Sequence, residues 1–238
     1  MKGVIFLHEI QSPLPLGGKA RSLMELMRQG FRVPKGYVIL PGVELDEGEL
    51  LEAFETLGCN QVAVRSSAVN EDGEKAAWAG QLETKLNVRR KGLINAINDC
   101  RESAKSARAQ AYAKAHGQES GGVAVIVQRM LASDISGVAF SKHPVTGQDA
   151  AVVEAVHGQG EQLVGGLVTP DTYVIDRSHT VTEQHLSGDQ PILTSPQLEE
   201  ITRLTWSIVE QFGHPVDVEW AYEGDTLYVL QARPITTL

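Results

Sequence analysis

The sequence has few cysteines and no apolar run of membrane-spanning length. Its two cysteines, Cys59 and Cys100, lack the spacing of a metal site and fit a reduced compartment as structural side chains. No stretch approaches the roughly 20 apolar residues that a membrane-spanning helix needs. The N-terminal segment also lacks the cleavage signature of a secretory signal. These absences predict a cytoplasmic protein.

An excess of basic residues is also missing. The formal net charge is -9, and this argues against nucleic-acid or anionic-membrane partners that bind through bulk electrostatics. A polyanionic ligand would need a focused pocket. With 238 residues, 42% of them hydrophobic, the chain can form one large domain or two modest lobes.

The first half of the sequence predicts mixed helices and strands. Apolar residues at helical spacing indicate a helix at 16–30 that opens on Gly17 and Gly18, and a longer, alanine-lined helix at 89–116. The other elements expected in this half are strands at 33–40 and 61–68, with an acidic helix at 44–55 between them.

The second half is rich in β-forming runs, which predict a largely antiparallel sheet. A helix follows, with Ser195 as its cap, Pro196 in its first turn and Gly213 at its end. A glycine-containing stretch at 117–122 divides the chain into expected lobes at 1–118 and 119–238. The β-rich runs are 122–131, 136–141, 150–156 and 171–177, and a hairpin at 216–234 closes the chain.

The hairpin carries two carboxylates, an amide and a guanidinium in alternating positions. Asp217 and Glu219 share one face of the first strand, and Gln231 and Arg233 share one face of the second. A three-residue loop at 223–225 would place Asp217 opposite Gln231 and bring the polar sets together. A two-residue loop would separate them, so convergence requires the longer loop or a bulge.

Converging carboxylate and amide oxygens suit Mg²⁺, which takes few protein ligands and completes its shell with water and phosphates. An arginine beside them could hold phosphate oxygens bidentately. A solvated hairpin edge is the alternative interpretation of the same residues.

Other segments offer weaker signals for phosphate binding. Gly17, Gly18 and Lys19 at a helix start could bind phosphate or form a simple turn. Arg65 ends an apolar strand before two serines, where it is either a phosphate ligand or an ordinary surface arginine. The glycine-rich run at 157–166 could clamp a ligand or merely turn the chain.

Six ordered segments together resemble the N-terminal nucleotide-binding domain of phosphoenolpyruvate synthase, pyruvate phosphate dikinase and rifampin phosphotransferase. The resemblance implies an α+β fold of the ATP-grasp type, with two lobes, a nucleotide cleft between them and a metal-binding hairpin in the second lobe. The segments are "LGGKARSL", "VPKGYVI", "VAVRSSAVNEDGEKAAWAGQLETKLNV", "VIVQRMLASDISGVAFSKHPVTG", "GQGEQLVGGLVTPDTYVID" and "VDVEWAYEGDTLYVLQARPIT".

The resemblance also implies roles for matching residues in binding ATP and Mg²⁺. Lys19 and Arg65 would hold ATP phosphates and assist catalysis, and Gly80 and Gln81 match the loop that closes over the triphosphate. Two residues of "VIVQRM" would contribute to nucleotide binding, Gln128 and Met130.

In the hairpin, the resemblance makes Glu219 and Gln231 the Mg²⁺ ligands. Arg233 would be catalytic, stabilising charge on the transferred group, while Asp217 would support the site without ligating the metal. The sequence departs from the family at 158–161, which reads Gly-Gln-Gly-Glu in place of Gly-Leu-Gly-Glu, and it is shorter than expected between residues 40 and 62.

No phosphohistidine domain follows in this sequence. His143 and His157 fall where the family's phosphoacceptor is not expected, so we expect the acceptor on a separate phosphohistidine-domain protein. The sequence therefore predicts an ATP-dependent phosphotransferase subunit that transfers a phosphoryl or pyrophosphoryl group to a partner histidine. A non-catalytic nucleotide-binding regulatory module is the alternative, and a stand-alone small-molecule kinase ranks behind both.

Overall fold

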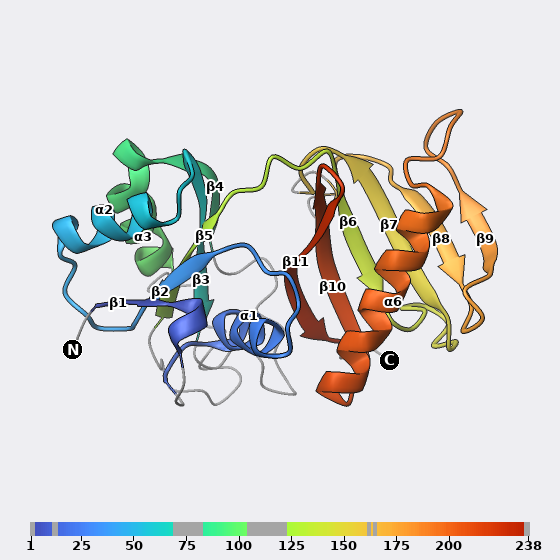
Figure 1. The fold of residues 1–238 in the computed structure, drawn as a ribbon, viewed down its shortest axis with the longest axis horizontal. Coiled ribbons are helices and arrows are strands. Elements are labelled where there is room, and N and C mark those ends of the chain that lie inside the picture. Colours follow the sequence, from blue (N-terminus) through green and yellow to red (C-terminus); the bar gives the residue numbers. More distant parts are fainter. Residues whose placement is uncertain are drawn as a thin grey trace. The chain divides into compact units, whose positions relative to one another are not determined.

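The computed structural model describes residues 3–10, 14–68, 83–103, 123–160, 163 and 166–235 (Figure 1). The chain forms two compact units, one of Met1–Arg28 with Pro34–Met130 and one of Gln29–Val33 with Leu131–Leu238. The division expected after residue 118 precedes strand β5 (Val123–Arg129), which lies within the first unit because it pairs with strands on both sides there.

The first unit is built on a five-stranded antiparallel sheet of order β1-β2-β5-β3-β4. The sequence predicted three of these strands but neither of the sheet's edge strands. Besides β5, they are β1 (Val4–Phe6), β2 (Gly36–Ile39), β3 (Gln61–Ala68) and β4 (Thr84–Arg89).

Helices cover both faces of this sheet (Figure 1). Helices α2 (Glu47–Thr56) and α3 (Leu93–Ser103) pack on one face, over a core that includes Val62, Val64 and Ile97. Helix α1 (Gly18–Arg28) contacts β3 and lies on the other face. Short 3-10 turns at Leu7–Glu9 and Arg90–Gly92 complete the described elements of this unit.

The helix expected at 89–116 is only partly described. Its first residue, Arg89, ends strand β4, and the helix begins at Leu93 after the 3-10 turn. Residues 104–116 lie outside the described part of the chain. The expected start is therefore four residues early, because β4 pairs with β3 up to Arg89.

The second unit contains a six-stranded sheet of order β11-β10-β6-β7-β8-β9, in which every neighbouring pair is antiparallel. This confirms the predicted antiparallel sheet, although the run at 122–131 belongs to the first sheet. The strands are β6 (Ile135–Phe140), β7 (Ala151–His157), β8 (Asp171–Ile175), β9 (Val181–His185), β10 (Val216–Glu223) and β11 (Thr226–Pro234).

Helix α6 (Ser195–Phe212) covers one face of the second sheet, over a core that contains Trp206 and Trp220 (Figure 1). Its predicted cap was wrong by one residue. Thr194 is the N-cap, and its backbone N–H donates to the Gln197 side chain at 2.9 Å. Gly213 ends the helix with φ of 76°, as expected of a glycine cap.

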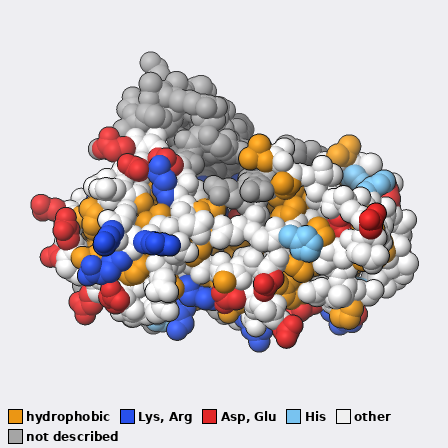
Figure 2. Space-filling model, turned by 90° about the horizontal axis from the view of Figure 1, so that it is seen from above, with side chains coloured by type: hydrophobic (Ala, Val, Ile, Leu, Met, Phe, Trp, Pro, Cys, Tyr) orange, Lys and Arg blue, Asp and Glu red, His pale blue; other side chains and the backbone are white. Residues whose placement is uncertain are grey.

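Charges of both signs are mixed on the described surface in Figure 2. Exposed pairs such as Arg90 with Glu55 and Arg203 with Glu199 illustrate the mixing.

No helix among the described residues combines the length and hydropathy that a bilayer crossing requires.

Asp171 is a fully buried carboxylate that fastens the segment before α6 to the sheet. It accepts hydrogen bonds from the Ser187 backbone and hydroxyl at 2.7 Å, from the Ile192 backbone at 2.8 Å and from the Tyr173 hydroxyl at 2.9 Å. Burial acts to raise the pKa of Asp171, but these donors outweigh it and lower the pKa. The folded state therefore favours the ionised form.

Asp171→Asn should destabilise the second unit by at least about 2 kcal/mol at pH 7, because buried donors lose a charged acceptor. The lowered pKa makes this contribution fully present above the unfolded value of about 3.9 and lost as pH falls through the folded value. Urea unfolding followed by tryptophan fluorescence at several pH values measures the difference.

Asp176→Asn is the matched control, because Asp176 also accepts three hydrogen bonds, from Ser178 and Thr180, but in an exposed turn. It should lose less stability than Asp171→Asn. An Asp171→Asn deficit that stays constant from pH 7 to pH 2 would contradict the assignment.

Candidate functional site

A bulge sets the register of the hairpin β10–β11. Glu223 pairs with Thr226 around a two-residue loop, Gly224 and Asp225, and the ladder continues regularly as far as Trp220 and Val229. The register then shifts, so that Glu219 pairs with Gln231 and Leu230 is the extra residue. Asp217 pairs with Arg233 in turn.

This register corrects the predicted one in two respects. The loop has two residues rather than three, and Asp217 faces Arg233 rather than Gln231. The bulge nevertheless supplies the one-residue shift that convergence requires, so all four polar side chains share one face. The opposite face carries Trp220 and the rest of the core under α6.

Arg233 bridges the two carboxylates of the hairpin. Its Nη2 lies 3.3 Å from Glu219 Oε1, and its Nε lies 3.5 Å from Asp217 Oδ1. Burial raises the pKa of Asp217, although the guanidinium acts in the opposite direction. Arg233 thus places a positive charge beside two neighbouring carboxylates.

Gln231 carries the clearest sign of a ligand on this face. The side chain is 1% exposed, and its amide nitrogen donates weakly to the Ala232 carbonyl at 3.4 Å. Its Oε1 is buried and has no hydrogen-bond partner among the described residues. Buried acceptors are rarely left unsatisfied. A hard amide oxygen directly across the ladder from a carboxylate fits Mg²⁺.

Two ligands suffice for such a site. No group of three or more His, Cys, Asp and Glu side chains among the described residues is placed to hold a metal. Mg²⁺ is commonly bound through one or two protein groups, with water and substrate phosphates completing its octahedron. Glu219 and Gln231 are therefore chemically adequate for Mg²⁺ that arrives with a nucleotide.

In the first unit, the fold brings the predicted phosphate-binding segments together. Lys19 Nζ donates to the Ser66 carbonyl at 3.3 Å, and the Ala20 backbone N–H donates to the Ser67 hydroxyl at 3.2 Å. Arg65 is 9% exposed and lies on the same face of β3 as Ser67. Lys19 and this Arg-Ser-Ser run thus meet at the N-terminus of α1.

Gly17 makes this close approach possible. Its φ is 76°, and a Cβ there would lie 2.5 Å from the Ser67 carbonyl oxygen and hydroxyl. Only glycine fits both the conformation and the space. The first turn of α1 therefore rests directly on the end of β3.

The structure describes two of the four other residues that were predicted to bind the nucleotide. Gln128 is 3% exposed, shares the Arg65 face of the sheet through its pairing with Ala63, and donates to the Pro34 carbonyl at 3.1 Å. The Met130 backbone N–H donates to the Gln61 carbonyl. Gly80 and Gln81 lie outside the described residues.

His143 accepts hydrogen bonds within the turn in which it lies. Its Nδ1 lies 3.2 Å from the Val145 backbone nitrogen and 3.3 Å from that of Thr146, and both are donors. An Nδ1 that accepts hydrogen bonds leaves the proton of a neutral imidazole on Nε2. Neither nitrogen then offers a free lone pair to a phosphorus atom.

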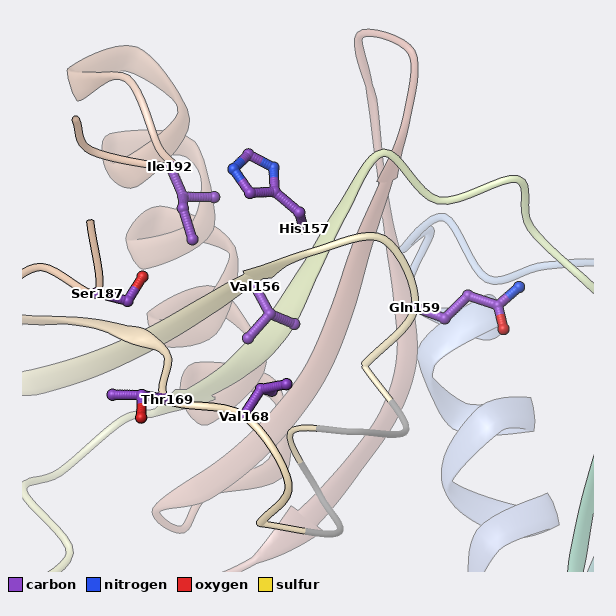
Figure 3. Close-up of a pocket in the computed structure, with 7 residues that line it drawn as sticks. All are labelled: Val156, His157, Gln159, Val168, Thr169, Ser187 and Ile192. Carbon is purple, nitrogen blue, oxygen red and sulfur yellow. The ribbon is translucent and has the colours of Figure 1, made fainter. Parts of the chain in front are cut away.

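His157 lines a small cavity of about 210 Å³ at the end of β7, together with apolar and hydroxyl side chains (Figure 3). In this view Gln159 points away from the ring of His157. The cavity contains none of the predicted site residues. Its lining is Val156, His157, Gln159, Val168, Thr169, Ser187 and Ile192.

Two residues on these faces were not predicted from the sequence. Ser67 lies within β3 and accepts a hydrogen bond from the first turn of α1, and a serine in a strand carries no sequence signal for that contact. Glu154 on β7 lies in the same cross-strand row as Glu219, through Val138 between them. It sat inside an apolar run, and only the strand order reveals its position.

The two sheets and the site face define a protein of the ATP-grasp fold. A solved Pyrococcus horikoshii protein, PH1788, is similar, with a TM-score of 0.53 at 15% identity, covering 90% of this chain and 88% of that one. D-alanyl-alanine synthetase A from Vibrio cholerae matches with a TM-score of 0.51 at 10% identity, covering 92% of this chain and 56% of that one.

Residues 44–195 and 178–238 match the family described as pyruvate phosphate dikinase, AMP/ATP-binding domain, and the chain belongs to this family. A probable phosphoenolpyruvate synthase of Archaeoglobus fulgidus is 33% identical over 315 residues, covering 99% of this chain and 42% of the relative. An uncharacterized phosphotransferase of Bacillus subtilis, YvkC, is 30% identical over 293 residues, with 100% and 35% covered. The chain therefore spans less than half the length of these relatives.

Proposed function

We propose that the protein binds Mg-ATP and transfers a phosphoryl or pyrophosphoryl group to a histidine on a separate phosphohistidine-domain protein. The family match supports ATP as the ligand. The observation that carries the proposal is the hairpin, where a buried amide oxygen without a partner faces Glu219 across the ladder beside Arg233.

The first unit supplies groups for the phosphates. The N-terminus of α1 carries a partial positive charge and, with the Lys19 ammonium, suits a polyphosphate. Lys19 is held near the Ser66 carbonyl and Arg65 is nearly buried, so both cations are partly positioned before a ligand arrives. Pre-positioned charges lose little entropy on binding.

The second unit supplies the metal ligands and a movable charge. Glu219 and Gln231 would hold Mg²⁺, which would neutralise phosphate charge. Arg233, whose Nη2 contacts Glu219 Oε1 at 3.3 Å, would compete with this ion for the same carboxylate. We propose that this competition releases the Arg233 guanidinium toward the transferred group, where it stabilises developing charge.

The acceptor is proposed to lie on a partner because neither His143 nor His157 falls where the family's phosphoacceptor is expected. His143 uses its Nδ1 within its own turn. Phosphoryl transfer depends on positioning an in-line nucleophile, and alignment is worth roughly 7 to 11 kcal/mol at its best. Water without such alignment should react slowly, so the chain alone should turn over little ATP.

Glu219→Ala should weaken ATP binding strongly in the presence of Mg²⁺ and little in its absence, because it removes one of two hard-oxygen ligands. Without Mg²⁺ the loss should be small, since Arg233 loses only its Glu219 contact at 3.3 Å and keeps Asp217 as a partner. Calorimetry with Mg²⁺ and with a chelator measures both.

Asp225→Asn serves as the control for Glu219→Ala, because Asp225 is an exposed carboxylate in the loop of the same hairpin. It should bind Mg-ATP like the wild type. An equal loss for Glu219→Ala with and without Mg²⁺ would remove Glu219 from the metal site.

Radiolabelled ATP should label a supplied phosphohistidine-type domain, and that label should vanish when its acceptor histidine becomes alanine. Separate β- and γ-labelled ATP distinguishes pyrophosphoryl from phosphoryl transfer. Arg233→Ala should lower the single-turnover rate more than it weakens binding, because its contact forms in the transition state.

Stable self-labelling of the chain that His143→Ala or His157→Ala removes would overturn the partner model. Tight Mg-ATP binding with no transfer to any acceptor would favour the regulatory alternative. Retention of Lys19, Arg65 and Arg233 together is the feature that favours catalysis, because binding alone would not require all three.

A further inference from the structure

Glu154 is a half-buried carboxylate on β7 that has no role in the proposed function. Its side chain makes no hydrogen bond or ion pair with any described residue. Burial raises the pKa of Glu154. A carboxylate that is partly removed from water and left without a partner opposes folding, so its presence on a sheet face requires another explanation.

The strand order places this carboxylate beside the hairpin. Glu219 on β10 is directly opposite Val138 on β6, and Val138 is directly opposite Glu154 on β7. Residues that face each other across an antiparallel ladder share one side of the sheet. Glu154, Val138, Glu219 and Gln231 therefore form one row, here called the carboxylate row.

The spacing along the carboxylate row suits a hydrated cation. Two strand spacings separate the backbones of Glu154 and Glu219 by about 10 Å. Both side chains rise from the same face with only the short Val138 between them. That separation is wide for two direct ligands of one small ion. It leaves room for an ion that carries water on one side, and Mg²⁺ usually retains several waters.

We propose that Glu154 is a further residue of the magnesium site, which holds the water shell of the ion bound directly by Glu219 and Gln231. This inference rests on the proposed function, since it deepens the same site. The buried Gln231 Oε1, which has no partner in the described part of the chain, is the independent sign that this row receives a ligand. Glu154 then acts as a positioning residue that fixes the ion from the side opposite Gln231.

Glu154→Gln tests the inference because it keeps the shape and removes the charge. Outer-sphere partners of metals commonly contribute 10- to 100-fold to metal affinity, so we expect Mg²⁺ to promote ATP binding at concentrations about 10-fold or more higher in the variant. Binding measured with a chelator should match the wild type. Calorimetry of Mg²⁺ titrated into protein with a non-hydrolysable ATP analogue gives both values.

The apo variant should unfold at the same temperature as the wild type or higher, because the substitution removes an uncompensated charge. A variant that gains stability and loses magnesium affinity cannot have lost binding through misfolding. Glu183→Gln is the matched control, since Glu183 lies on the same face of the same sheet, as its pairing with Val174 shows, but is exposed on edge strand β9. It should bind like the wild type.

The outcomes separate this inference from the proposed function. Wild-type protein that fails to bind Mg-ATP would overturn both. Normal magnesium dependence in Glu154→Gln, beside a defect in Glu219→Ala, would overturn only the role of Glu154. An equal loss with and without Mg²⁺ would also overturn it, because Glu154 would then contact the nucleotide rather than the ion.

Discussion

The bulge at Leu230 is the constraint on which the candidate site depends. Side chains alternate strictly along a strand, so a regular ladder closed by the two-residue loop would place Leu230 opposite Glu219 and turn Gln231 toward the core. One extra residue reverses this for the last part of β11 while the rest of the hairpin keeps its apolar face under α6. The same strand thus packs a core and presents an amide and a guanidinium to the opposite face.

Polar groups on that face lower the stability of the folded protein. Gln231 has a buried oxygen without a partner, Asp217 has a raised pKa, and Glu154 is half-buried without a counter-charge among the described residues. By contrast, the fully buried Asp171, which has a structural role, accepts hydrogen bonds from four donors. A buried amide oxygen that has no partner among the described residues, next to carboxylates on the face opposite α6, is a physical sign of a binding surface.

Much of the fold could be predicted from local pattern. Helix α6 and strand β3 carry clear periodicity, and the antiparallel second sheet followed from short β-rich runs. The edge strand β9 could not be predicted, because all five of its residues are exposed. Its sequence therefore shows no alternation of buried apolar and exposed polar residues. In the site, the sequence alone predicted which hairpin residues are functional candidates. It did not predict the register of the hairpin, because the bulge has no sequence signal here. The contact of Ser67 with α1 and the position of Glu154 beside the hairpin emerge only from the tertiary fold, which brings together residues far apart in the chain.

The most direct test of the account is a crystal structure of the protein with Mg²⁺ and a non-hydrolysable ATP analogue. The account predicts a cation within about 2.1 Å of a Glu219 carboxylate oxygen and of Gln231 Oε1, with water in the remaining positions not taken by phosphate. The Arg233 guanidinium should have left Glu219 for a phosphate oxygen. A metal held by other residues, with Gln231 Oε1 still unpartnered and Arg233 still on Glu219, would contradict the central claim.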